Sequence, residues 1–191
     1  MARRKMLAAN EQVANRVAEL AKRRGTTVFQ TVNDILEQAM RVEEMGLSLK
    51  EVVDKREALE KARRLGFAFT IERLLYEVVD LACNRDKDDV SEIWLDTGRW
   101  YGKYFASRSK DGVREFREAL ELLSFGTYEF DLKENRGGGA VSVDCVGEHF
   151  TGGYSELFSL FIEGVFDAFG YRPVNREVSK SIIRLRFEKP R

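Results

Sequence analysis

Apolar residues recur with helical spacing through the first part of the chain and predict two amphipathic helices. The first begins after Asn10, whose side chain suits an N-cap, and ends at Gly25, a natural C-terminal stop. The second begins after Thr26 or Thr27 and ends at Gly46. The two apolar faces contain Val13, Ala14, Val17, Leu20 and Ala21 in the first helix and Val28, Val32, Ile35, Leu36 and Ala39 in the second.

A short strand and a charged helix flank this helical pair. Residues 3–8 (RRKMLA) are predicted to form the strand. Ser48 is a candidate N-cap for a helix over about 49–65, which is dense in charged residues. Its heptad seam contains Leu49, Val52 and Leu59 but also Arg56 and Arg63. Because this coiled-coil signal is weak, we expect a helical connector and leave dimer contacts along it open.

Three helices are predicted after Gly66, over about 70–83, 89–108 and 111–124. Their apolar positions are Ile71, Leu74, Leu75, Val78, Val79 and Ala82, then Val90, Ile93, Trp94, Trp100, Tyr101, Tyr104 and Phe105, then Val113, Phe116, Leu120 and Leu123. The segment NRDKDD between the first two helices is predicted to be a loop, and Gly126 is predicted to end the third helix.

The period of the apolar pattern then changes to two, which predicts strands. The alternating apolar residues are Tyr128, Phe130 and Leu132, then Val141, Val143 and Cys145. A flexible turn at Gly137–Gly139 separates the two runs, so together they predict a β-hairpin. A helix with an aromatic face follows over about 153–169, and strands over 174–179 and 182–188 close the chain.

The predicted fold class is therefore α+β. Residues 1–46 form a strand-helix-helix module, residues 47–66 a charged helical connector, and residues 67–191 a C-terminal α/β domain with antiparallel strands and an aromatic-rich helix. A length of 191 residues and a hydrophobic content of 43% suffice for one or two packed domains and argue against disorder.

The net charge of zero is the sum of two unlike parts. Lys and Arg together number 32, as do Asp and Glu. The first 24 residues hold seven basic and two acidic residues, whereas residues 67–191 hold 18 basic and 22 acidic residues. A basic end on an acidic body is typical of proteins that assign nucleic-acid contact to one segment.

Several classes of protein and site are disfavoured. No apolar stretch approaches about 18 residues and the N-terminus lacks an apolar signal core, so we expect neither a membrane partner nor a signal peptide. Cys83 and Cys145 are the only cysteines and form no CxxC pair, and His149 is the only histidine. We therefore expect no metal, no cofactor and a reducing cytoplasm as the compartment.

The N-terminal module is too small to bury a core alone, because chains below about 40 residues usually need a partner or cross-links. Pairing residues 3–8 with the same strand of a second copy would create a two-stranded ribbon backed by four helices. Such a ribbon fits the major groove of B-DNA, where arginines can donate to guanine.

Residues 3–42, with RRKMLA, two amphipathic helices and a Gly-Thr-Thr turn, resemble the ribbon-helix-helix family of DNA-binding repressors. The resemblance implies a homodimer on double-stranded DNA, with Leu7 and Ala9 buried. It implies that Arg4, Met6 and Ala8 face the bases, while Arg3 and Lys5 act on phosphates. It also implies a phosphate clamp at the N-terminus of the second helix, at Thr26, Thr27 and Val28. The usual polar triplet of the strand is absent. The alternative is a plain helical hairpin with a solvated basic face.

The C-terminal domain resembles the 4-vinyl-reductase family, which is similar in fold to a subunit of the vesicle-tethering TRAPP complex. The segments that carry this resemblance are WLDTGRWYGKYFASR with Gly98 and Gly102, ELLSFGTYEFDL, GGYSELFSLFIEGVFDAFG and IIRLRFEKP. It implies a pocket for a small hydrophobic effector, but the cysteines that suggest metal in the family are missing from the last strand. Candidate ligand-binding residues are Trp100, Tyr101, Tyr104, Phe105, Cys145, His149, Tyr154, Phe158 and Phe161. The alternative is that these aromatic stripes are core.

Catalysis has little support in the sequence. His149 beside Glu148 is a candidate general base, although a lone histidine at a strand–helix junction is more often only hydrogen-bonded there. Cys145 is predicted to be a buried, inert thiol. No GxSxG is present, and the GGGA segment is predicted to be a turn. The sequence favours a dimeric DNA-binding transcription regulator whose C-terminal domain binds an effector or mediates assembly. The alternative is a small-molecule carrier with a dimerising N-terminus and no DNA binding.

Overall fold

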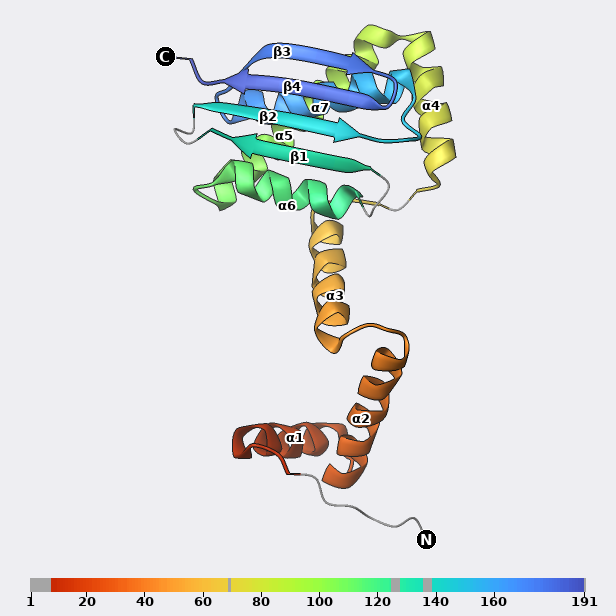
Figure 1. Ribbon diagram of the computed structural model, residues 1–191, viewed down its shortest axis with the longest axis vertical. Coiled ribbons are helices and arrows are strands. Elements are labelled where there is room, and N and C mark those ends of the chain that lie inside the picture. Colours follow the sequence, from red (N-terminus) through yellow and green to blue (C-terminus); the bar gives the residue numbers. More distant parts are fainter. Residues whose placement is uncertain (1–7, 69, 125–127, 136–138, 191) are drawn as a thin grey trace. The chain divides into compact units, whose positions relative to one another are not determined.

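A computed structural model describes residues 8–68, 70–124, 128–135 and 139–190 (Figure 1). The chain divides into two compact units, Met1–Leu59 and Glu60–Arg191, and each is described by itself. The described residues contain seven helices and one four-stranded antiparallel sheet, which confirms the α+β class.

The N-terminal unit is helical throughout its described residues. It contains α1 (Glu11–Arg24), α2 (Val28–Glu44) and the beginning of α3 (Leu49–Arg64). Asn10 caps α1 by accepting a hydrogen bond from the Gln12 backbone N–H at 2.9 Å. The strand predicted at residues 3–8 falls on residues that lie outside the described ones except for Ala8, which belongs to no strand.

The N-terminal unit has almost no core of its own. Of its described residues only Ala21 and Thr31 are buried. Several apolar side chains of α2 are exposed instead, at Val28, Phe29, Ile35, Leu36 and Met40. Ser48 begins α3 with a reciprocal cap, because its hydroxyl accepts from the Glu51 N–H and the Glu51 carboxylate accepts from the Ser48 N–H at 2.7 Å.

The second unit begins with the end of α3, which is followed by α4 (Glu72–Arg85) and α5 (Lys87–Arg108). The loop predicted for NRDKDD is wrong, because only Asp86 lies between these helices. Asp86 ends α4 and also caps α5, where its carboxylate accepts from the Asp89 N–H at 3.2 Å. Asp86 alone therefore connects the two helices.

The buried face of α4 agrees with the predicted one only in part, since Val79 is buried and Leu75 and Ala82 are partly buried as predicted. Tyr76 and Val79 are buried, whereas Ile71, Leu74 and Val78 are exposed together with Leu81. The spacing of apolar residues identifies candidate positions along a helix, but it does not show which of them face the core. Tyr76, which was not among the predicted apolar positions, lies on the packed side, where its ring contacts Phe150 and Tyr154.

The other elements match the predicted order with ends shifted by up to two residues. They are α6 (Gly112–Ser124), β1 (Glu129–Glu134), β2 (Ala140–Val146), α7 (Gly152–Ala168), β3 (Arg172–Ser179) and β4 (Ile182–Glu188). The predicted stop at Gly126 and most of the predicted turn at Gly137–Gly139 lie outside the described residues. The strands follow the order β1-β2-β4-β3, and every neighbouring pair is antiparallel.

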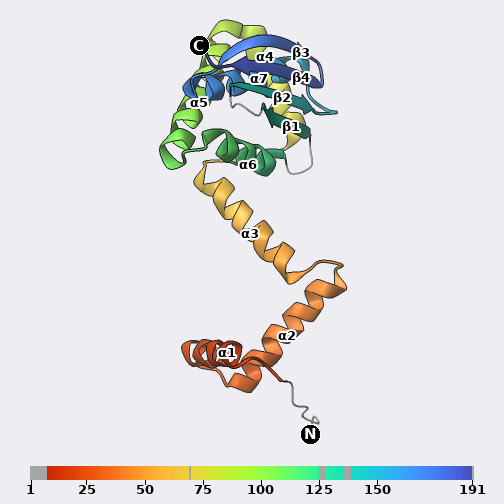
Figure 2. The same ribbon diagram turned by 60° about the vertical axis from the view of Figure 1, so that its left-hand side comes forward.

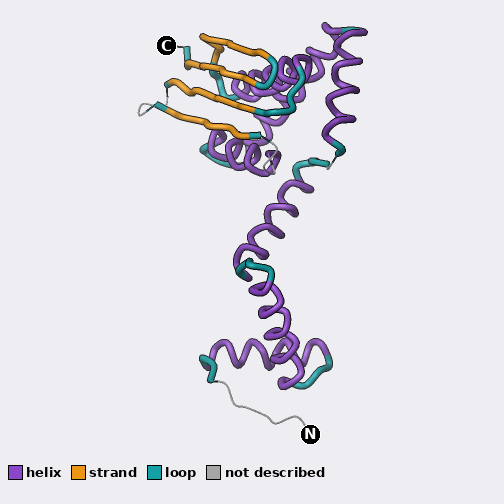
Figure 3. The backbone as a smooth tube through the Cα atoms, turned by 45° about the vertical axis from the view of Figure 1, so that its right-hand side comes forward, coloured by secondary structure: helices purple, strands orange, loops and turns teal. Residues whose placement is uncertain are grey.

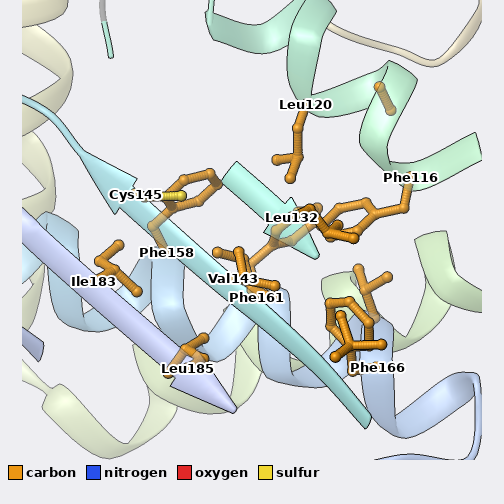
Figure 4. Close-up of a cluster of buried hydrophobic side chains, with 14 of the residues drawn as sticks. Phe116, Leu120, Leu132, Val143, Cys145, Phe158, Phe161, Phe166, Ile183 and Leu185 are labelled. Carbon is orange, nitrogen blue, oxygen red and sulfur yellow. The ribbon is translucent and has the colours of Figure 1, made fainter. Parts of the chain in front are cut away.

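One face of the sheet carries the core. Val143 of β2 lies opposite Leu132 of β1 and Leu185 of β4, and all three side chains are buried. Figure 2 shows α5 and α7 on one side of the sheet, and Figure 3 shows helices beside the orange strands of the same sheet. In Figure 4 the side chains of α6 and α7 enter the same apolar cluster. The α7 sequence is apolar around most of its circumference because α7 packs against both α5 and the sheet.

Candidate functional site

The turn between α1 and α2 gathers positive charge at a helix N-terminus. Lys22, Arg23 and Arg24 form the last turn of α1, and Gly25 then adopts a left-handed conformation with φ of 67°. The first turn of α2 contains no acidic residue. In the part of the chain that the structure describes, none of the three cations pairs with a carboxylate. Free N–H groups, a helix dipole and unpaired cations together suit an anion such as phosphate.

Threonines fix the geometry of this turn. Thr27 caps α2 by accepting a hydrogen bond from the Gln30 N–H at 3.1 Å. The hydroxyls of Thr26 and Thr31 are 2.7 Å apart and share a hydrogen bond, and Thr31 is buried. The Thr26 N–H donates to the Ala21 carbonyl at 3.1 Å, which closes the end of α1. The chain therefore enters α2 along a defined path.

Four of the predicted DNA-contacting residues, Arg3, Arg4, Lys5 and Met6, lie outside the described residues. The other four lie on either side of α1. Ala8 is exposed ahead of α1, Thr26 is partly buried, and Thr27 and Val28 are exposed where α2 begins. Lys22, Arg23 and Arg24 were not among the residues predicted from the sequence to contact DNA. The signal that could have found them is the basic count of the first 24 residues.

Five of the predicted ligand-binding residues form a chain of contacting rings in the C-terminal unit. Tyr154 stacks on Phe158 at a centroid distance of 5.6 Å, and Phe158 stacks on Phe161 at 6.1 Å. Tyr101 of α5 contacts Phe161 at 5.8 Å and Phe105 at 6.0 Å. Contacts at these distances provide offset and edge-to-face packing between aromatic rings.

Further aromatic residues join this chain of rings and were not among the predicted ligand-binding residues: Phe67, Trp94 and Phe116, and also Tyr76, Tyr128 and Phe150. Tyr76 contacts Tyr154 at 4.7 Å, and Tyr128 contacts Phe150 at 5.3 Å. Tyr128 and Phe150 each contact Phe158 as well. Tyr76, Tyr128 and Phe150 come from α4, the segment before β1 and the loop before α7, so no single periodic pattern in the sequence marks them.

Two of the remaining predicted residues extend this chain of rings, since Trp100 contacts Tyr101 at 5.0 Å and Tyr104 contacts Phe105 at 5.8 Å. Trp100 and His149 are exposed, and Tyr104 is partly buried and stacks on Trp100. Cys145 is fully buried in β2 on the core face. Two shallow surface depressions are lined by described residues, one near Ser142 and one along the first half of α5, and neither includes any of the nine predicted residues. Ligand binding by these residues stays a prediction.

We call this chain of contacting rings the ring cluster, and burial keeps the ionisable groups in and beside it protonated. It raises the pKa of the Cys145 thiol to about 12, with the nearby Asp144 adding to the effect. It also raises the pKa values of Tyr76, Tyr128 and Tyr154 above their usual range. The Tyr76 hydroxyl donates to the Glu72 carboxylate at 2.8 Å. At neutral pH these groups are hydrogen-bond donors rather than nucleophiles or bases.

The described residues contain no group of three or more His, Cys, Asp or Glu side chains placed to hold a metal ion. No helix in the described ranges is long and apolar enough to cross a membrane. Comparison with protein-family models, curated proteins and solved structures gave no match to this chain.

Proposed function

We propose that this protein is a dimeric DNA-binding transcription regulator. Its N-terminal unit acts as a ribbon-helix-helix module, and its C-terminal unit binds a small hydrophobic effector or mediates assembly. The observation that carries the proposal is the α1–α2 pair, which combines an exposed apolar face with cations beside the N-terminus of α2 that pair with no carboxylate among the described residues.

The exposed face of α2 supports dimerisation. Phe29 is 57% exposed and Met40 is 60% exposed, while Ile35 and Leu36 lie between them on the same helix. Fully burying side chains of this size contributes about 1.5 to 3 kcal/mol each. This unit, of whose described residues only two are buried, gains a core when the same face of a second copy covers it.

The cations support DNA as the partner. A two-fold dimer presents Lys22, Arg23 and Arg24 from each copy, together with two N-termini of α2. These groups would contact phosphates and position the protein, which leaves base contact to the segment before α1. The resemblance assigns that contact to Arg4, Met6 and Ala8, with Arg3 and Lys5 on the backbone.

The ring cluster supports the role given to the C-terminal unit. Tyr101, Phe105, Tyr154, Phe158 and Phe161 form a contiguous cluster of packed aromatic rings from α5 and α7, which includes the phenol groups of two tyrosines. An apolar site with few polar groups is the usual form of a small-molecule pocket. An effector would regulate DNA binding by favouring one arrangement of the dimer over another.

Fluorescence anisotropy with labelled genomic fragments at increasing salt tests DNA binding. Six phosphate contacts per dimer correspond to a slope of about −5 for log affinity against log salt concentration. We expect the triple variant Lys22→Ala, Arg23→Ala, Arg24→Ala to weaken binding and flatten this slope. The triple variant Arg3→Ala, Arg4→Ala, Lys5→Ala should remove the remaining affinity.

A matched control removes three exposed lysines of the C-terminal unit, at Lys87, Lys110 and Lys180. It should leave the affinity and the slope unchanged. Absence of binding by the wild-type chain at about 50 mM salt, where non-specific contacts are strong, would overturn the regulator proposal. A dimer without DNA binding would favour the carrier alternative, and native mass spectrometry would then show whether a small molecule copurifies.

A further inference from the structure

The outward face of α5 exposes two large apolar side chains. On the opposite face Gly98 and Gly102 pack against the α7 backbone. Ile93 is 62% exposed and Trp100 is 58% exposed. Seven residues are nearly two full helical turns, so both side chains lie on one side of the helix. A tryptophan exposed to this extent is a common anchor of protein interfaces.

Charges along the same face are sorted by sign. The half of α5 that contains Ile93 carries Asp89, Glu92 and Asp96, which line a shallow depression together with Ile93 and Thr97. The half that contains Trp100 carries Lys103 and Arg108. Within the described ranges neither Glu92 nor Lys103 takes part in an ion pair or a side-chain hydrogen bond. Asp96 pairs with Arg99 at 2.9 Å.

The basic half is already ordered. The Trp100 ring stacks on Tyr104 with a centroid distance of 5.6 Å and an interplanar angle of 13°. The Arg108 guanidinium lies 4.8 Å from the centroid of the same Tyr104 ring. Because these side chains are held in place, little conformational entropy remains to be lost when they bind a partner.

The apolar and charged pairs share one centre. The midpoint of Ile93 and Trp100 lies between Asp96 and Thr97, and that of Glu92 and Lys103 lies between Thr97 and Gly98. These midpoints differ by one residue, or about 1.5 Å along the helix. A two-fold axis near Thr97 would therefore place Ile93 opposite Trp100 of an antiparallel second copy. The same axis would place Glu92 opposite Lys103 of that copy.

We propose that this face of α5 is a self-association surface that binds the same face of a second copy. Trp100 packs on Ile93 of the second copy, in the acidic depression, and Lys103 meets Glu92 of the second copy. The contact is isologous, so each pairing occurs twice.

The charge order distinguishes α5 from the other exposed apolar stripe of this unit. On α4, Ile71, Leu74, Val78 and Leu81 are exposed, but the flanking Arg73 and Glu77 already pair with each other at 3.3 Å. Because these charges already pair with each other on α4, they do not favour binding to a second copy of the chain. On α5 the complementary charges are separated by three helical turns and can meet only between chains.

The proposed surface is small, since it consists of one helical face. Interfaces below about 1,200 Å² are weak or transient, and we expect a dissociation constant in the range of about 10 to 100 μM. The α5 pairing is separate from the dimerisation proposed for α2. In a dimer joined through α2 it would hold the two C-terminal units together or link neighbouring dimers.

Sedimentation equilibrium of the full chain tests the α5 pairing. The Ile35→Gln/Leu36→Gln background removes the α2 face, so that α5 is the only proposed contact. We expect a monomer–dimer equilibrium in this background. Lys103→Glu and Glu92→Lys should each weaken it about tenfold, because two pairs become repulsive. The double variant Glu92→Lys/Lys103→Glu should restore it, since reversed charges meet again between antiparallel copies.

Trp100→Ala should abolish the association, and Lys180→Glu, the same charge reversal on the turn after β3, should leave it unchanged. Circular dichroism would verify that each variant is folded. In the Trp94→Phe background the emission of Trp100 should shift to the blue as concentration rises. Purely monomeric behaviour, or single reversals that the double reversal does not rescue, would overturn the proposal. Failure of the α2 dimer would instead appear as an Ile35→Gln/Leu36→Gln variant that behaves like the wild type.

Discussion

Gly98 and Gly164 lie against each other where α5 crosses α7. A Cβ atom on Gly98 would be 2.0 Å from the Phe161 carbonyl oxygen, and one on Gly164 would be 2.1 Å from the Leu95 carbonyl oxygen. Both obstacles are backbone atoms, which cannot turn aside as a side chain can. The two glycines therefore set the distance between the helices that carry Phe105, Phe158, Phe161 and Phe166 of the aromatic core.

Replacing either glycine by alanine should separate α5 from α7. We expect Gly98→Ala and Gly164→Ala each to lower the free energy of unfolding by about 3 kcal/mol, because the added methyl overpacks a tight core. Denaturant titration followed by circular dichroism measures the change. Gly152→Ala is the matched control, since nothing lies within 4 Å of a Cβ at that position of α7. Equal stability of all three variants would contradict the close approach.

The sequence identified half of this crossing. Gly98 and Gly102 stand out in the sequence because they are four residues apart on one helix, a spacing that permits close backbone approach, and the structure places both against the α7 backbone. Gly164 was not singled out, because its helix is apolar on nearly every side and the predicted aromatic face does not mark the glycine that meets α5. Periodicity locates a contact surface only where a helix has a polar side to contrast with it.

The short connection at Asp86 was missed for a different reason. Charged residues in NRDKDD are typical of loops, yet the same residues are favourable at helix ends. Composition alone does not distinguish a loop from two abutting caps. Part of the candidate site could not be predicted from the sequence either, because Tyr76, Tyr128 and Phe150 come together only in the tertiary fold.

Asp86 should stabilise the α4–α5 junction through its cap. We expect Asp86→Ala to cost about 1 kcal/mol of unfolding free energy, because the Asp89 N–H loses its acceptor. Asp86→Asn should cost less, since an asparagine oxygen also caps. Thermal unfolding of both variants beside Asp88→Ala, an exposed position in the first turn of α5, provides the comparison. A larger loss for Asp88→Ala than for Asp86→Ala would disprove the capping role.

The two thiols should react at different rates. Cys83 is partly exposed and Cys145 is fully buried, so a small aromatic disulfide reagent should label one thiol per native chain at first. Burial also raises the pKa of Cys83, which keeps even this reaction slower than that of a free thiol. Cys83→Ser should remove the first phase, and denaturant should expose Cys145. Rapid labelling of Cys145 in native Cys83→Ser protein would contradict its burial.

Alkaline pH should destabilise the C-terminal unit through Cys145. The thiol has an ordinary pKa of 9.0 and a folded pKa of about 12. Well below pH 9 the Cys145 thiol is protonated in both the folded and the unfolded chain. Between these values the unfolded chain loses the proton while the folded chain keeps it, so stability falls as pH rises. At about pH 10 the wild type should have lost about 1 kcal/mol more than Cys145→Val, relative to neutral pH. Identical pH profiles would exclude this contribution.

The apolar face of α2 should control the oligomeric state of the chain. Ile35 and Leu36 are both exposed on this face, and replacing each by glutamine keeps the helix while removing the surface that a second copy would cover. We expect Ile35→Gln/Leu36→Gln to be monomeric at about 1 μM, where a wild-type interface of standard size remains dimeric. Light scattering after size exclusion measures the mass. Glu37→Gln adds the same amide on the polar side of α2 and should stay dimeric. A wild-type monomer, or a variant as dimeric as the wild type, would mean that this face is not where the copies meet.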